Sequence, residues 1–200
     1  MTLHHLLFLA LITVVLCGCR PEDTSPIDRY RAAVTEGLAA APSARETVLG
    51  IDLGITDRQF FDRCTELNQQ QVITNGGGAN VVEHPMVNDL DRPARMTFRP
   101  VFLETSPRRV QAIEVKFIYN DWSPWNARAR ADSLLPHVAD YFRRTLPTDL
   151  IELQHPRHGR TFASVDGNRL LAIWKEDDST VTGMITDLST LDSDPLQLAN

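Results

Sequence analysis

Apolar residues between positions 56 and 71 recur at helical spacing and place Phe60, Cys64 and Leu67 on one face. Ahead of them, Thr56–Gln59 begins with a Thr and ends with a Gln three residues later. This is the pattern of a capping box, which satisfies backbone N–H groups at the start of a helix. The sequence therefore predicts an amphipathic helix over 56–71.

Downstream of this helix, apolar residues recur at every second position. Residues 95–103 and 110–119 alternate apolar with polar positions, which predicts two half-buried strands, and a shorter strand is predicted near 80–84. Pro100 has no N–H group to donate to a neighbouring strand. It therefore belongs at a sheet edge or at a bulge.

A second helical region is predicted to start at Ser123–Pro124. Pro136 breaks a continuous helix unless it falls in a first turn, so we expect a kink or a new start near 133, with Ser133 as the cap. The apolar face of this region consists of Leu134, Leu135, Val138 and Phe142.

Residues 149–188 predict three or four further strands, with a tight hairpin at Val165–Arg169 because Asp-Gly and Gly-Asn favour two-residue turns. The elements thus follow the order helix, strands, helix, strands. This order predicts an α+β fold in which two main helices pack on a largely antiparallel sheet.

The N-terminus carries an apolar run over residues 6–16 that is too short to span a bilayer comfortably and is typical of an export signal. The segment Leu16–Cys19 follows it and resembles the lipobox of bacterial lipoproteins, in which the cysteine receives diacylglycerol and becomes the first residue. The segment Met1–His5 contains no Lys or Arg. The alternative is a leader that is uncleaved or cleaved elsewhere, with Cys17 and Cys19 as ordinary thiols.

The lipobox resemblance implies a bacterial envelope protein anchored to a membrane through Cys19. Arg20 would follow the lipidated cysteine instead of the Asp that retains lipoproteins in the inner membrane, so we expect the outer membrane, facing the periplasm, in a Gram-negative cell. The predicted organisation is a signal peptide (1–18), a lipidated N-terminus and tether (19–45) with a short helix at 27–39, one α+β domain (46–190) and a C-terminal tail (191–200).

Composition narrows the function classes. The net charge of −6 and the scattered acidic residues argue against nucleic acid, which selects clustered Lys and Arg. If the leader is removed before Cys19, Cys64 is the one cysteine left in the domain and has no partner for a disulfide. Cys64 shares its helix face with Phe60 and Leu67, so we interpret it as a small buried apolar residue and not as a nucleophile.

Few residues suggest chemistry. His155 and His158 with His84 have the donor type of a zinc or copper site, but no acidic or thiol ligand stands at a recognised spacing. Asn88–Asp91 lacks the glycine and glutamate of a calcium loop and is interpreted as an acidic turn. We therefore expect no metal, no cofactor and no catalytic residue, and the absence of a catalytic motif favours a protein that is not an enzyme.

The most unusual segment is Trp122–Asn126. Trp122, Trp125 and Asn126 are candidates for binding a partner protein or a sugar, because exposed tryptophans anchor interfaces and stack on glycans. The structural alternative, which we favour from the sequence alone, is that both rings wedge the helix start against the sheet.

One further resemblance comes from Leu53–Phe60, a glycine ahead of a capped helix. This stretch resembles the small SmpA/OmlA (BamE-like) envelope lipoproteins, although the chain is longer than that module. Together with Trp122–Asn126 and Val165–Arg169, it also resembles uncharacterised bacterial lipoproteins.

Three functions are therefore expected in order of preference. The first is a non-catalytic, lipid-anchored module that binds another envelope protein, and the second is a binding protein for a small ligand or glycan. The third is a hydrolase that uses two carboxylates, which requires a cleft with both acids facing each other.

A Cys19→Ala variant tests the lipid anchor. We expect it to lose a metabolically incorporated acyl label and to leave the membrane fraction, because the thiol that carries the lipid is gone. The matched control is Cys17→Ala, which should keep both. Acyl label or membrane retention in the Cys19→Ala variant would refute the assignment.

Overall fold

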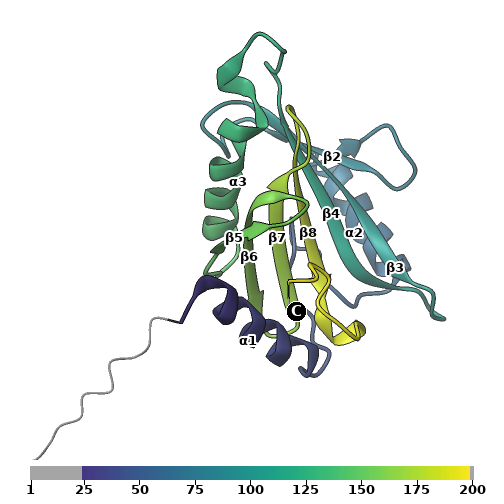
Figure 1. Cartoon of the computed structure of the whole chain (residues 1–200). Helices are drawn as coiled ribbons and strands as arrows, with labels where there is room; N and C mark the ends of the chain where they lie inside the picture. Colours follow the sequence, from purple (N-terminus) through teal and green to yellow (C-terminus); the bar gives the residue numbers. More distant parts are fainter. Residues whose placement is uncertain (1–23, 199–200) are drawn as a thin grey trace, which may run out of the picture.

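The computed structural model describes residues 24–198, and the cysteines and apolar run of the leader lie outside this range. Its centre is an eight-stranded antiparallel sheet with the strand order β1-β2-β3-β4-β8-β7-β6-β5 (Figure 1). The helices are α1 (Pro26–Leu38), α2 (Asp57–Gln69) and α3 (Ala131–Thr145), with 3-10 turns η1 (Ala127–Ala129) and η2 (Leu188–Thr190). The strands are β1 (Thr74–Asn75), β2 (Val82–Met86), β3 (Ala94–Leu103), β4 (Arg109–Tyr119), β5 (Ile151–His155), β6 (Gly159–Asp166), β7 (Arg169–Lys175) and β8 (Val181–Asp187).

The sheet consists of two halves, each made of one helix and the four strands that follow it. Strands β1 to β4 follow α2, and strands β5 to β8 follow α3. The last strand of each half meets the other at the centre, where β4 and β8 pair from Ala112 opposite Thr186 to Phe117 opposite Val181. This central pairing turns two four-stranded units into one sheet.

The main core lies between the sheet and helices α2 and α3. Alternate residues of β4 and β8, such as Val115 and Ile185, are buried there with Phe60 of α2 and Phe142 of α3. Gly183 faces Val115 across the central pair, and a Cβ atom on Gly183 would lie 2.7 Å from Val115 Cγ2. The absence of a side chain there lets α3 pack close to the middle of the sheet.

The opposite face of the C-terminal half is covered as well. Tyr30 and Val34 of α1 pack on Leu170 and Ala172 of β7, while the alternate residues of β7 face α3. Residues 188–198 lie beside α1 on the same face (Figure 1). Strand β7 is therefore apolar on both faces, which explains why its sequence is a nearly continuous hydrophobic run.

A buried carboxylate holds the C-terminal segment to α1. The Tyr30 hydroxyl donates to Asp194 Oδ1 at 2.5 Å, and the backbone N–H groups of Leu196 and Leu198 donate to the same carboxylate. The Arg31 guanidinium also donates to the Leu198 carbonyl at 3.0 Å. Helix α1 and residues 191–198 are thus parts of one packed unit. The folded unit is larger than the predicted domain over 46–190.

The α+β class and the antiparallel sheet are confirmed. The capping box forms as predicted, with the Thr56 hydroxyl accepting from Gln59 N–H and the Gln59 side chain accepting from Thr56 N–H. The pairing of β3 with β2 ends at Phe98, so Pro100 lies at an edge and next to the bulge between Val101 and Phe102.

The prediction for the second main helix was wrong at its start. Helix α3 begins at Ala131 after the turn η1, and it runs through Pro136 without a restart at Ser133. The start is set by tertiary structure, because the Ala131 N–H donates to the Asp178 carbonyl in the loop between β7 and β8. Burial of the helix face offsets the one backbone hydrogen bond that proline removes.

A Tyr30→Phe variant tests whether α1 is part of the folded unit. We expect it to lower the free energy of unfolding by about 1–3 kcal/mol, because it leaves the buried Asp194 carboxylate one donor short. Chemical denaturation measures this loss, and Glu36→Gln on the exposed side of α1 is the control. An unchanged midpoint for Tyr30→Phe would show that α1 does not depend on this bond.

Candidate functional site

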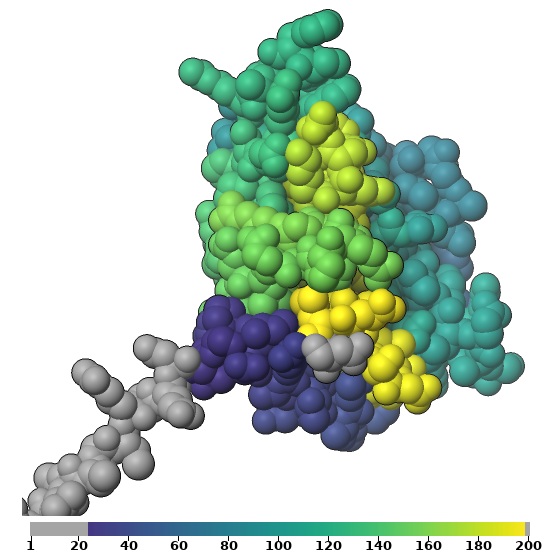
Figure 2. Space-filling view, viewed as in Figure 1, coloured from purple at the N-terminus to yellow at the C-terminus, as the bar shows by residue number. Residues whose placement is uncertain are grey.

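The loop between β4 and α3, residues 120–130, projects from one end of the molecule and is named here the tryptophan loop. It is the uppermost segment in Figure 1, and helix α1 lies at the opposite end. The space-filling view shows the same loop standing clear of the strands and helices below it (Figure 2). Strand β4 ends at Tyr119 and helix α3 begins at Ala131. Both of these residues are buried, so the two ends of the loop are fixed in the core.

Backbone hydrogen bonds give the tryptophan loop a defined course. The Asn120 N–H donates to the Pro93 carbonyl at 3.1 Å, and the Trp122 N–H donates to the Tyr119 carbonyl at 3.2 Å. Further along, the Asn126 N–H donates to Ser123 and the Ala129 N–H to Asn126, each at 3.0 Å. The loop is therefore a succession of tight turns.

Side chains add to this order. The Asp121 carboxylate accepts from the Arg92 guanidinium at 3.1 Å and from the Asn126 amide at 3.2 Å, and the Arg130 guanidinium donates to the Pro124 carbonyl at 3.1 Å. Arg92 also lies over the Tyr119 ring, 5.1 Å from its centroid. Asn126, a predicted binding residue, thus uses its amide N–H₂ within the loop.

The two tryptophans are exposed. The exposed fraction is 92% for Trp125 and 38% for Trp122. The interpretation that both rings wedge the helix against the sheet is therefore wrong, since Trp125 contributes nothing to the core. The small buried residues Ala129 and Ala131 fill the space at the helix start instead.

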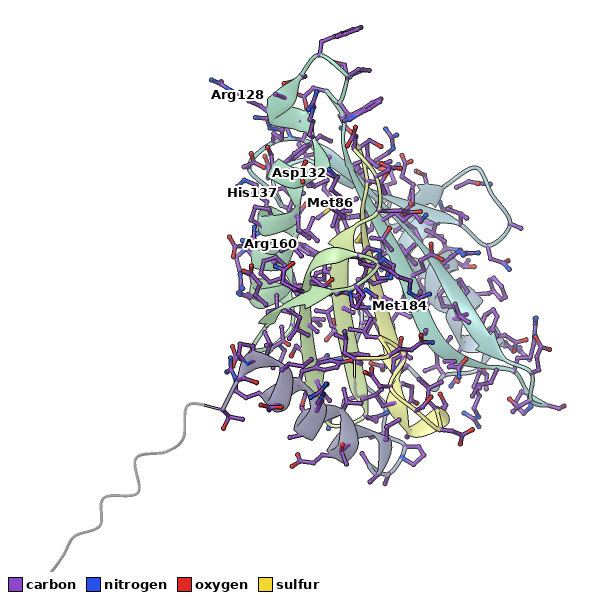
Figure 3. The ribbon with its side chains drawn as sticks, in the orientation of Figure 1. Met86, Arg128, Asp132, His137, Arg160 and Met184 are labelled. Carbon is purple, nitrogen blue, oxygen red and sulfur yellow. The ribbon has the colours of Figure 1, made fainter. Side chains whose placement is uncertain are left out.

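Arg128 is a second candidate residue of this loop that sequence reasoning missed. Its side chain lies in the turn η1, below the apex of the loop, and points away from the molecule (Figure 3), and no ion pair or hydrogen bond joins its guanidinium to another described residue. The sequence feature that could have identified Arg128 is its position three residues after Trp125. The loop therefore carries an exposed indole and an exposed guanidinium that forms no ion pair within residues 24–198.

The histidines do not converge on one site. His155 and His158 stack with ring centroids 4.4 Å apart, and His158 stacks on Trp174 at 4.6 Å. His84 lies elsewhere, with Nδ1 2.7 Å from the Val72 carbonyl, and His137 lies 3.6 Å from Asp91. Within residues 24–198 no group of three or more His, Cys, Asp or Glu side chains is arranged to hold a metal ion.

The His155 imidazole has a structural role in the turn between β5 and β6. Its Nδ1 accepts the backbone N–H groups of Arg157 and His158 at 3.0 and 3.1 Å, so its Nε2 carries the proton and donates to the Leu196 carbonyl at 2.9 Å. The ring therefore ties this turn to the C-terminal segment.

The other sequence candidates also have structural surroundings. Cys64 is half-buried against the main core, and burial raises the pKa of its thiol to about 11, which keeps it protonated near neutral pH. In the Asn88–Asp91 turn, Asp91 accepts from the Tyr119 hydroxyl at 2.5 Å and lies 3.5 Å from Arg92. Asp91 therefore provides a hydrogen-bond acceptor for the hydroxyl of Tyr119, whose ring is part of the main core.

One hollow of about 350 Å³ is lined by two carboxylates, Glu46 and Asp89, with His84 and Tyr141. Burial and then the Asp89 charge raise the pKa of Tyr141 to about 12, so its phenol stays neutral. A reaction that uses two carboxylates would need Glu46 and Asp89 to face each other across this hollow.

Comparisons with known proteins give no relative: no protein-family model, no curated protein and no solved structure matches the chain. The resemblance to SmpA/OmlA lipoproteins therefore stays a prediction. Among the helices of residues 24–198, none has the length and apolarity needed to cross a membrane.

A pH titration tests the histidine stack. Burial, and then the nearby His155 and Arg157 charges, lower the pKa of His158 below its ordinary value of 6.5. The unfolded chain thus takes up a proton before the folded protein does, so the free energy of unfolding should fall as the pH drops through about 6.5. Denaturant unfolding across this range should show a smaller fall for His158→Gln. An identical pH dependence in both proteins would contradict this role.

Proposed function

We propose that the protein is a non-catalytic, lipid-anchored envelope protein that binds a partner protein through the tryptophan loop. The observation that carries the proposal is the 92% exposure of Trp125 in a loop that is otherwise well ordered by hydrogen bonds. A large exposed ring adds nothing to the stability of the monomer. In an interface the same ring would be removed from water and would contribute strongly to binding.

The order of the loop supports a role in recognition. Asp121 holds Arg92 and Asn126, and Arg130 holds the Pro124 carbonyl, so the backbone that carries Trp125 is restrained before any partner arrives. Binding then costs little conformational entropy beyond that of the indole itself. Tryptophan and arginine are also the residues that most often dominate interface energies.

The exposed groups define the chemistry of the partner. Trp125 needs an apolar pocket that accepts an indole, and Arg128, which has no ion pair within the described residues, needs a carboxylate nearby. A protein surface with an apolar pocket and an acidic rim meets both requirements. Electrostatic attraction to Arg128 would mainly raise the association rate and fix the orientation.

The position of the loop also fits an anchored protein. Residues 20–25 separate Cys19 from the first residue of α1, so a lipid on Cys19 holds the start of α1 within about 25 Å of the membrane surface. The tryptophan loop lies at the other end of the molecule from α1 (Figure 1). Under this proposal the loop faces away from the anchoring membrane, toward the envelope space where partners are found.

Glycan binding is the alternative that the exposed rings also favour, because both indoles can stack on a sugar face. The partner-protein proposal is preferred because Asn126, the residue best suited to hydrogen-bond a sugar, already donates to Asp121 within the loop.

A Trp125→Ala variant tests the proposal by crosslinking in intact cells followed by identification of the attached protein. We expect one envelope protein to crosslink to the wild type and its binding to the variant to weaken by about 2–4 kcal/mol, which is at least thirtyfold in affinity. Arg128→Gln should weaken binding less and should lower the association rate.

The control is Val87→Ala, which removes another large exposed apolar side chain, 59% exposed, outside the loop. Equal crosslinking of the wild type and Trp125→Ala would refute a role for the loop. Loss of binding to peptidoglycan fragments, with protein crosslinks unchanged, would favour the glycan alternative.

A further inference from the structure

A cavity of about 510 Å³ lies where the segment after α1, the start of α2 and the beginnings of β4 and η2 meet. Its walls are mainly apolar and include Pro42, Ala44, Leu53, Ile55, Leu103 and Val110. A mainly apolar hollow of this size with a few polar groups is the usual form of a small-ligand site. Arg109 and Val110 begin β4, whereas the tryptophan loop follows the other end of that strand, so the cavity is separate from the loop.

The first polar group of interest in this cavity is Asp187. The residue is only 3% exposed, and its Oδ1 accepts three hydrogen bonds, from the Asn168 amide at 2.7 Å and from the Ser189 N–H and hydroxyl at 3.0 and 2.6 Å. Its Oδ2 accepts none from any residue in the described range, and no Arg or Lys there pairs with it. Oδ2 is not fully shielded from solvent, so it can accept a hydrogen bond from a donor that enters the cavity.

The second group is Arg109. One guanidinium nitrogen, Nη1, donates to the Gly54 carbonyl at 2.8 Å, which fixes the side chain at the cavity wall. No carboxylate of residues 24–198 forms an ion pair with it. Asp187 and Arg109 therefore line one cavity with opposite charges that pair neither with each other nor with other residues.

We propose that this cavity binds a small zwitterion with an apolar body, whose amine bonds Asp187 Oδ2 and whose carboxylate bonds Arg109. Two opposite charges that line one hollow without pairing are complementary to a molecule that carries both charges apart from each other. The apolar walls between them suit aliphatic side chains. A short apolar peptide with free termini has this chemistry, and charge-assisted hydrogen bonds at both ends would orient it.

A purely cationic or purely anionic ligand fits less well. A lone amine would bring its positive charge near Arg109, and a lone carboxylate would bring its negative charge near the buried Asp187. A neutral apolar ligand would leave Asp187 Oδ2 without a donor in a site from which it has displaced water. Only a ligand with both charges satisfies both groups.

Leucyl-leucine is the probe, titrated calorimetrically into the full chain held in lipid nanodiscs. We expect measurable binding that weakens about tenfold or more with N-acetyl-leucyl-leucine, which lacks the amine, and similarly with leucyl-leucinamide, which lacks the carboxylate. Asp187→Asn and Arg109→Gln should each weaken the free dipeptide to a similar extent. The side-chain oxygen left by Asp187→Asn can still accept from Asn168 and Ser189, so the fold is expected to survive.

Arg108→Gln is the matched control, because it removes the same charge from the neighbouring residue, whose guanidinium pairs with Asp57 outside the cavity. Should Asp187→Asn fail to fold, Arg109→Gln and the two blocked dipeptides still decide the question. No binding of leucyl-leucine at millimolar concentration would overturn the proposal. Equal binding of the free and blocked dipeptides would also overturn it, in favour of a purely apolar occupant.

Discussion

The pairing of β4 with β8 is the contact on which the rest of the structure depends. It joins residues that lie about seventy positions apart, from Ala112 opposite Thr186 to Phe117 opposite Val181. Each half alone would have four strands with an open edge, whereas together they bury the last strand of each. Because Gly183 has no side chain, Phe142 of α3 can pack directly over this pair of strands.

The two halves of the sheet are covered by different elements. The cavity and the tryptophan loop therefore lie in different parts of the molecule. The C-terminal half is packed on both faces, by α3 on one and by α1 with residues 188–198 on the other. Polar contacts such as Tyr30 with Asp194 close the second face. At one end of β4 this arrangement leaves a cavity next to Asp187, and at the other end β4 leads into the tryptophan loop. The exposed Trp125 and the pair Asp187 and Arg109 are therefore associated with opposite ends of β4.

Local sequence signals were reliable where one short segment carries all the information. The Thr56–Gln59 capping box and the two-residue turn in Val165–Arg169 both form, and Gly167 in that turn has a positive φ of 58°. The start of α3 was misplaced because it depends on the Asp178 carbonyl, far along the chain. Similarly, Trp122 and Trp125 were expected to wedge the start of the helix against the sheet, because residue type alone does not show on which side of a turn a ring lies.

The sequence by itself determined the α+β class, the amphipathic helix at 56–71 and the alternating strands. It also identified Trp122–Asn126 as a candidate binding segment. These follow from periodicity and capping, which act within a few residues of one another. Tertiary structure alone decided that α1 belongs to the fold, that Trp125 is exposed, and that Asp187 and Arg109 line one cavity. Those facts depend on which distant segments are brought together by strand pairing, and no local pattern encodes that choice.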